Sequence, residues 1–230
     1  MKNERVCVID VEATGLNTRE DRITEVGIIE MFDFEPTGRF FHSYIYSGRE
    51  IPRIVIDITG ITSQFLKDKL RFSDIADDML NFIGLSKLVA HNSSYDEAMI
   101  NRELKICRKP QIDPNRFIDT YKIAKEKYAG KKASQDAIMK RLGIDASMRD
   151  KHGAIVDAYL LSLMYKKMCF EDNELFIEPV KVEDALATHY SAPQRPHPLP
   201  KLMTYKEGVA HRLFVDEINK LSKKKSLWPI

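Results

Sequence analysis

A short apolar strand that runs directly into two carboxylates constrains this chain more than any other stretch. Residues 5–15 read Arg-Val-Cys-Val-Ile-Asp-Val-Glu-Ala-Thr-Gly, and the apolar run is too short for a helix. Alternate residues of a strand point to the same face, so Asp10 and Glu12 project together, and Thr14 and Gly15 are typical of a following turn. Neighbouring carboxylates repel each other unless a cation or a proton lies between them. The pair is either an ordinary acidic strand end or one part of a site with partners elsewhere in the chain.

The composition indicates a globular domain without a membrane-spanning helix. The chain has 230 residues, 43% hydrophobic and 30% charged, which is enough for one core and an additional segment. The net charge of +2 means that any nucleic-acid-binding surface must be local. No apolar run approaches the roughly 18 residues of a membrane span, and no signal peptide is expected before the first strand. The three cysteines have no paired spacing, so we expect a cytoplasmic protein without a disulfide framework or a zinc site.

The remaining apolar segments predict a mixed sheet with helices packed against it. Residues 22–32 and 40–46 read as strands joined by a turn at 36–38, and with the first strand they predict an antiparallel meander. Residues 87–91 and 117–119 read as a fourth and a fifth strand. Helices are expected at 74–83 after a capping Ser73, from 94 to about 104, at 120–127, at 135–142 and from 153 to about 169. This order predicts an α/β fold with a mixed five-stranded sheet flanked by helices.

Two further acids and a histidine lie where such a fold would bring them to the same edge of the sheet. The first and fourth strands are the expected central pair, and sites gather at the ends of central strands, so Asp96 should lie beside the acid pair. Asp157 lies in the first turns of the last core helix. His152 precedes Asp157 by five residues, which is about 140° away on a regular helix. His152 can therefore reach the same site only from the loop before the helix.

The types of side chain in this cluster indicate chemistry at phosphorus. Carboxylates with one histidine and no cysteine suit the hard cations Mg²⁺ or Mn²⁺ rather than zinc. Several carboxylates around two such ions form the arrangement used for in-line displacement, in which one ion activates a water and the other stabilises the leaving oxygen. An imidazole at the rim is suited to accept the proton. The cluster therefore predicts metal-dependent hydrolysis of a phosphodiester.

Three motifs in this order resemble the DEDDh family of 3′–5′ exonucleases, which has a ribonuclease H-like fold. The motifs are Ile9–Gly15, His91–Asp96 and His152–Asp157. The resemblance implies that two divalent cations are held by Asp10, Glu12, Asp96 and Asp157. It implies that His152 is the general base, and that Asp119 occupies a position where the family often has an acid beside the site. The residues that it implies for contact with substrate are Ala13, Thr14, Gly15, Asn92 and Tyr95.

Beyond Cys169 the composition changes to that of a linker followed by a short helix. Residues 191–200 contain four prolines, which excludes a helix or a central strand and predicts a semi-extended linker. Helical periodicity returns between Tyr205 and about Lys223, in a segment too short to fold alone. That segment either docks on the main domain or binds another protein. We therefore expect an exonuclease domain at 1–170, a flexible linker at 171–200 and a C-terminal helical segment at 201–230.

The C-terminal segment extends the resemblance to one branch of the family, the proofreading subunits of bacterial DNA polymerase III. Residues 209–228 are similar to the region through which those subunits bind the alpha-type polymerase subunit. The resemblance implies an enzyme that removes nucleoside monophosphates from single-stranded or mispaired DNA 3′ ends. Ala13 departs from the Thr that is usual at this position. Residues 169–193 contain no clear Gln-led clamp-binding peptide, so contact with a sliding clamp is not supported.

Two alternatives remain open at this stage. The core motifs do not separate DNA from RNA, because the two polymers share the terminal phosphodiester and differ only in the 2′-hydroxyl. An RNA-trimming enzyme of the same superfamily would therefore carry the same motifs. A subunit whose main role is to stabilise a polymerase complex would carry the same C-terminal segment. The basic residues of 121–132, with Arg149 and Lys151, either steer phosphates toward the site or form a solvated face.

Overall fold

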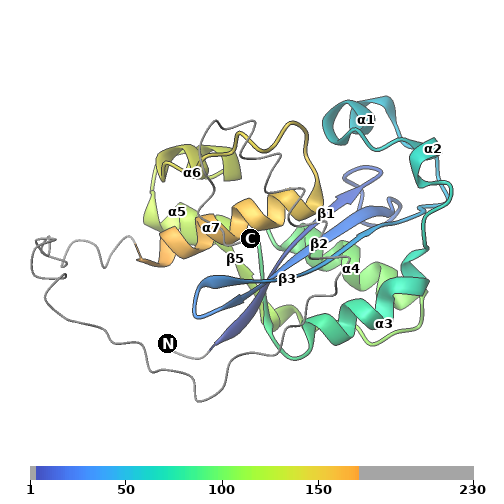
Figure 1. Cartoon of the computed structure of the whole chain (residues 1–230), viewed down its shortest axis with the longest axis horizontal. Helices are drawn as coiled ribbons and strands as arrows, with labels where there is room; N and C mark the ends of the chain where they lie inside the picture. Colours follow the sequence, from blue (N-terminus) through green and yellow to red (C-terminus); the bar gives the residue numbers. More distant parts are fainter. Residues whose placement is uncertain (1–3, 171–230) are drawn as a thin grey trace, which may run out of the picture. The chain divides into compact units, whose positions relative to one another are not determined.

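The computed structural model describes residues 4–170, which form a sheet with helices on both faces (Figure 1). The expected linker (171–200) and helical segment (201–230) lie outside the described residues. The strands are β1 (Arg5–Ala13), β2 (Ile23–Phe32), β3 (Glu35–Tyr44), β4 (Lys87–Ala90) and β5 (Phe117–Asp119). The helices are α1 (Arg53–Thr59), α2 (Ser63–Leu66), α3 (Phe72–Ile83), α4 (Ser94–Ile106), the 3₁₀ turn η1 (Pro114–Arg116), α5 (Thr120–Lys127), α6 (Gln135–Arg141) and α7 (Ala154–Phe170).

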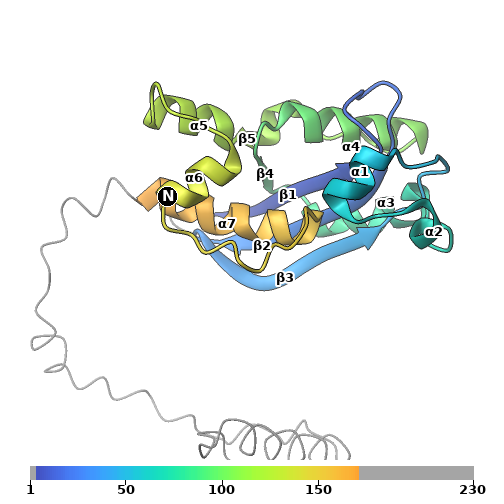
Figure 2. The ribbon, with the colours of Figure 1, turned by 90° about the horizontal axis from the view of Figure 1, so that it is seen from above.

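The five-stranded sheet has the order β3-β2-β1-β4-β5, with β1 in the centre (Figure 2). β2 pairs antiparallel with both β1 and β3, whereas β4 is parallel to β1 and β5 is parallel to β4. The predicted mixed sheet, its opening meander and the central pairing of the first and fourth strands are confirmed. Because β1 and β4 are parallel, the residues that follow them lie at the same edge of the sheet.

Alternate residues of β1 belong to two separate cores, one on each face of the sheet. Cys7, Ile9 and Val11 pack with the buried residues of α3 and α4. Val6 and Val8 pack on the other face with the buried residues of α7. In Figure 1 these helices lie on opposite sides of the sheet. Asp10 and Glu12 continue the row of Val6 and Val8, so the strand geometry directs both carboxylates toward the face that α7 covers.

The start of α7 lies in close contact with the middle of β2. A Cβ atom added to Gly27 would lie 2.3 Å from the carbonyl carbon of Ala154 and 2.4 Å from its oxygen. Gly27 is also the β2 partner of Asp10 on β1. The missing side chain at Gly27 therefore allows the first turn of α7 to approach the sheet beside Asp10.

The turn between β2 and β3 differs from the prediction. The chain reverses at Asp33 and Phe34, which both have positive φ angles of 49° and 67°. The predicted turn at 36–38 is wrong, because Gly38, with φ of 84°, lies within β3 opposite a register shift between Ile29 and Met31. A glycine in a strand commonly marks such a bulge, and a phenylalanine with positive φ gives no turn signal in the sequence.

The helices agree with the prediction except that α3 begins earlier than expected and two short helices precede it. α5 has the predicted bounds, and α7 begins at Ala154, which leaves His152 on the preceding loop as the geometry required. α3 begins one residue before the predicted cap Ser73, and its Asp74 carboxylate accepts from the Arg71 amide at 2.9 Å. The short helices α1 and α2 were not predicted. No helix within residues 4–170 has the length and apolar character needed to cross a membrane.

Candidate active site

The predicted acidic residues and His152 line one cavity of about 400 Å³ at the edge of the sheet, which we call the acidic cavity. Asp10 and Glu12 come from the end of β1, and Asp96 from the first turn of α4, directly after β4. Asp157 lies in the first turn of α7. The structure therefore brings together residues that are up to 147 positions apart in the sequence, from Asp10 to Asp157.

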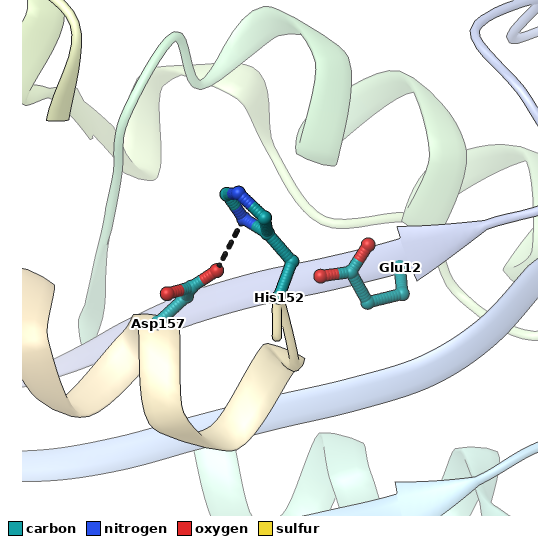
Figure 3. Close-up of side chains that lie close together, drawn as sticks. All are labelled: Glu12, His152 and Asp157. Atoms are coloured by element: carbon teal, nitrogen blue, oxygen red, sulfur yellow. Dashed lines mark hydrogen bonds and ion pairs between the residues drawn. The ribbon is translucent and has the colours of Figure 1, made fainter. Parts of the chain in front are cut away.

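Glu12, His152 and Asp157 lie close enough to share one metal ion. One potential ligand atom of each residue lies within 4.8 Å of those of the other two. Nδ1 of His152 is 3.0 Å from Oδ2 of Asp157, and Figure 3 shows this contact beside the Glu12 carboxylate. Carboxylate oxygens and one imidazole nitrogen suit a hard divalent cation. The donor set of this site therefore fits a divalent metal ion.

Three carboxyl groups of the acidic cavity, those of Asp10, Glu12 and Asp96, have raised pKa values. Burial raises the pKa of Asp10 well above its usual value, and the neighbouring Asp96 and Glu12 raise it further. Burial is also the main cause that raises the pKa of Glu12 to about 8, with a further contribution from Asp157. Burial raises the pKa of Asp96, although backbone hydrogen bonds oppose this. A divalent cation in the cavity would favour the ionised carboxylates, which agrees with the donor set.

The raised pKa values predict that divalent metal stabilises the protein by an amount that increases with pH. The folded state holds a proton on Glu12 up to about pH 8, whereas an unfolded glutamate releases it near 4.5. Without metal, the free energy of unfolding should therefore fall between about pH 5 and pH 8, because the folded state binds more protons in that range. Added Mg²⁺ or Mn²⁺ should stabilise the protein more at pH 8 than at pH 5.

Thermal unfolding in EDTA and in excess Mn²⁺, at pH 5 and at pH 8, measures this coupling. Glu12→Gln is the matched variant, because an amide does not titrate, and its loss of stability between pH 5 and pH 8 in EDTA should be smaller than that of the parent. Equal stabilisation by metal at both pH values would contradict the prediction.

The loop after β1 is fixed by its own polar groups. The Thr14 hydroxyl donates to Oδ1 of Asp21 at 2.7 Å, and the Tyr95 hydroxyl donates to the carbonyl oxygen of Gly15 at 2.7 Å. Both hydroxyls therefore hold the loop in place. Tyr95 thus links the loop after β1 to the start of α4, where Asp96 lies.

A second cavity of about 580 Å³ lies beside the acidic cavity, and we call it the apolar cavity. The two cavities share four residues in their walls: Val11, Glu12, Leu16 and Tyr95. Four predicted substrate-contacting residues line the apolar cavity: Ala13, Thr14, Gly15 and Tyr95. Its other wall includes Ile54 and Ile58 of α1. The fifth predicted residue, Asn92, lines the acidic cavity.

Asp119 holds the loop that follows β4. Its Oδ1 accepts from the backbone amide of Asn92 at 3.0 Å and from that of Tyr121 at 2.9 Å. Asp119 therefore caps α5 and at the same time fixes the loop after β4. Asn92 has a positive φ of 66° in this loop. Nδ1 of His91 lies 2.9 Å from the Thr120 hydroxyl, and burial lowers the pKa of His91. These contacts hold the loop between β4 and α4, which precedes Asp96, against the start of α5.

The sequence did not identify two charged residues that act on this site. Glu25 of β2 lies directly opposite Glu12 in the β1–β2 pairing, is 2% exposed, and its Oε1 is 2.8 Å from Nε2 of His42. Arg149 donates from Nη1 to Oδ1 of Asp157 at 2.9 Å, and its side chain is 12% exposed. Arg149 is therefore no part of a solvated basic face. A signal for Glu25 was available in the sequence. Glu25 is a charged residue within the apolar run of β2, the strand that follows the Asp10–Glu12 strand in the chain.

Comparison with known proteins assigns the chain to a family. The sequence profile of the exonuclease family RNase_T matches residues 7–165, which include every residue of the acidic cavity. The chain belongs to this exonuclease family. The DNA polymerase III subunit epsilon of Buchnera aphidicola subsp. Acyrthosiphon pisum is 44% identical to this exonuclease over 184 residues, covering 76% of this chain and 77% of the relative. The DNA polymerase III subunit epsilon of Rickettsia typhi is 35% identical over 232 residues, and the match covers 95% of this chain and 98% of the relative.

A solved structure supports the fold of this exonuclease independently. Exonuclease X, solved in complex with 5′ overhanging duplex DNA, has a TM-score of 0.59 and 23% sequence identity to it. The match covers 73% of this chain and 93% of Exonuclease X. The predicted ribonuclease H-like exonuclease fold is therefore confirmed.

Proposed function

We propose that this exonuclease hydrolyses terminal phosphodiesters at DNA 3′ ends, releases nucleoside monophosphates, and proofreads for a replicative polymerase as an epsilon subunit. The observation that carries the proposal is the acidic cavity, where Asp10, Glu12, Asp96, Asp157 and His152 meet at the end of the central strands. Relatives named DNA polymerase III subunit epsilon, at up to 44% identity, support the choice of substrate and role. A protein with this role works in the cytoplasm of a bacterium.

The four carboxylates would hold two divalent cations, Mg²⁺ or Mn²⁺. Bound there, the ions supply an activated water and charge stabilisation of the leaving oxygen. Each carboxylate oxygen has two lone pairs, so Asp157 can hold His152 through one and retain others for a cation. The contact between Nδ1 of His152 and Asp157 orients the ring. The His152 side chain is 47% exposed, which leaves Nε2 accessible to take the proton of the attacking water.

The apolar cavity provides a place for the terminal nucleotide. The two cavities adjoin, so a terminal nucleotide whose phosphodiester is held at the acidic cavity would place its base against the apolar walls that Ala13, Leu16 and Ile54 contribute. A nucleobase can bury its flat faces against such walls, and its contacts there do not depend on sequence. The hydrogen bonds of Thr14 and Tyr95 would act on the substrate by fixing the loop after β1, which lines this cavity at Thr14 and Gly15.

Degradation of matched oligonucleotides tests the substrate and direction. In Mg²⁺ or Mn²⁺ the purified protein should shorten single-stranded and 3′-mispaired DNA from the 3′ end and release mononucleotides, and it should act at least about tenfold more slowly on RNA of the same sequence. A 3′-phosphorothioate linkage serves as the control for direction. Faster degradation of RNA would support the RNA-trimming alternative, and no hydrolysis of either polymer would defeat both.

The segment 201–230 is proposed to bind an alpha-type subunit of DNA polymerase III, with 171–200 as the connecting linker. The similarity to the Rickettsia typhi epsilon subunit extends over 95% of the chain and so reaches into this segment. Deleting residues 190–230 should abolish co-elution with the polymerase subunit in size-exclusion chromatography and leave hydrolysis of free oligonucleotides within about twofold of the parent. Retained co-elution would place the binding surface in the exonuclease domain, and lost hydrolysis would show that the segment is part of the domain.

A further inference from the structure

Arg149 is a fixed cation in the wall of the acidic cavity. It lies on the segment between α6 and α7, and its guanidinium donates from Nη1 to Oδ1 of Asp157 at 2.9 Å and from Nη2 to Oδ1 of Asp136. The Arg149 side chain is 12% exposed and the Asp157 side chain is 6% exposed. Asp10 and Glu12 line the same cavity. A guanidinium held at two points in this way keeps both its charge and its position.

The contact fixes the orientation of the Asp157 carboxylate from both sides. Oδ1 of Asp157 contacts Arg149, and Oδ2 contacts Nδ1 of His152 at 3.0 Å. The Gln135 amide also donates to the backbone oxygen of Asp157 at 3.1 Å. Because Arg149 and His152 belong to the same short segment, the bond from Arg149 to Asp157 also holds the loop that carries His152.

The positive charge of Arg149 orients the Asp157 carboxylate but opposes the binding of divalent cations. A positive charge 2.9 Å from Oδ1 of Asp157, in the wall of the cavity, repels a divalent cation that binds there, and low exposure reduces the screening of this repulsion. The same side chain therefore orients the reacting groups and weakens the attraction of the cavity for metal. If Arg149 only supported the local fold, its replacement would lower both the rate of hydrolysis and the affinity for metal.

We propose that Arg149 is a positioning residue, which orients Asp157 and His152 for hydrolysis while lowering the affinity of the acidic cavity for divalent cations. This inference rests on the proposed function. It distinguishes Arg149 from a residue that contacts the phosphates of the substrate. Such a residue would change KM for the oligonucleotide rather than kcat and metal affinity.

Arg149→Gln and Arg149→Lys separate charge from geometry. Arg149→Gln should bind Mn²⁺ about threefold to tenfold more tightly, measured by electron paramagnetic resonance or calorimetry without substrate. Its kcat at saturating metal should fall by about tenfold to a hundredfold. Arg149→Lys retains the charge but not the two-point contact, so its Mn²⁺ affinity should stay near that of the parent while its kcat falls. Asp145→Asn is the matched control, because it changes an exposed carboxylate on the same segment that does not line the acidic cavity, and both the Mn²⁺ affinity and kcat should change less than threefold.

Several outcomes would overturn the proposal. Weaker Mn²⁺ binding by Arg149→Gln would show that the residue only supports the local fold, and a parental kcat with a raised KM would show that it contacts substrate. If Arg149→Gln does not fold, as judged by its thermal unfolding, the Arg149→Lys variant decides, and a parental kcat for that variant would refute the positioning role. The Mn²⁺ measurement needs no substrate, so it remains informative if the parent proves unable to hydrolyse DNA from the 3′ end.

Discussion

Asp10→Asn should abolish exonuclease activity while leaving the protein folded. Asp10 lies on the central strand, and burial together with Asp96, Glu12 and Asp157 raises its pKa, so it is within electrostatic reach of the other three acids proposed to bind metal. Losing the charge at this position should reduce kcat/KM by about 10³-fold or more, which corresponds to ~4 kcal/mol of transition-state stabilisation. A radiolabelled single-stranded DNA assay in saturating Mg²⁺ measures the loss.

The same substitution should not destabilise the protein in the absence of metal. The isosteric amide fills the same volume and removes the charge that the burial of Asp10 disfavours, so the midpoint of thermal unfolding in EDTA at pH 8 should equal or exceed that of the parent. Asp145→Asn is the matched control, because Asp145 is exposed and its loss should leave activity within about twofold. If Asp10→Asn degrades DNA at the parental rate, the assignment of the site is wrong.

The parts of the site that the sequence could predict are those with a local signal. The alternation of residues along β1 was enough to place Asp10 and Glu12 on one face, because the period of a strand is fixed by backbone geometry. The position of His152 before α7 followed from the angular period of a helix and is confirmed by the first helical residue, Ala154. The meeting of Asp96 with the acid pair followed from the edge that parallel strands share.

The residues that the sequence did not reveal depend on contacts between distant segments. Glu25 faces Glu12 only because β1 and β2 pair in one particular register, and a slip by one residue would turn Glu25 to the other face. For Arg149 the sequence left open whether it steers phosphates or belongs to a solvated face, and neither interpretation included its bond to Asp157, which depends on the path of an irregular segment that has no periodicity. The turn at Asp33 and Phe34 was missed because Gly38 gave the stronger turn signal and serves a bulge instead.

Gly27→Ala should destabilise the protein strongly and reduce its activity as well, although Gly27 lies outside both cavities. The added methyl group would lie 2.3 Å from the carbonyl carbon of Ala154 and 2.4 Å from the amide nitrogen of Ile155, which are backbone atoms that cannot turn away. α7 must move outward or the strand must bend, at about 3 kcal/mol for an overpacked contact of this kind. For a domain of this size that corresponds to a fall of about 10 °C in the midpoint of thermal unfolding.

Activity should fall because α7 carries Asp157 and determines where the loop with His152 begins. A displacement of about 1 Å at a reacting group can reduce the rate about 10²-fold, so kcat of Gly27→Ala should fall by that order even at a temperature where the variant is fully folded. Gly153→Ala is the matched control on the other side of the same contact, since its added methyl group would meet Oε2 of Glu25 at 3.7 Å, an ordinary van der Waals distance. Parental stability of Gly27→Ala would show that α7 is not held against β2 at this point. A parental kcat in a destabilised variant would show that the position of α7 does not control the geometry of the acidic cavity.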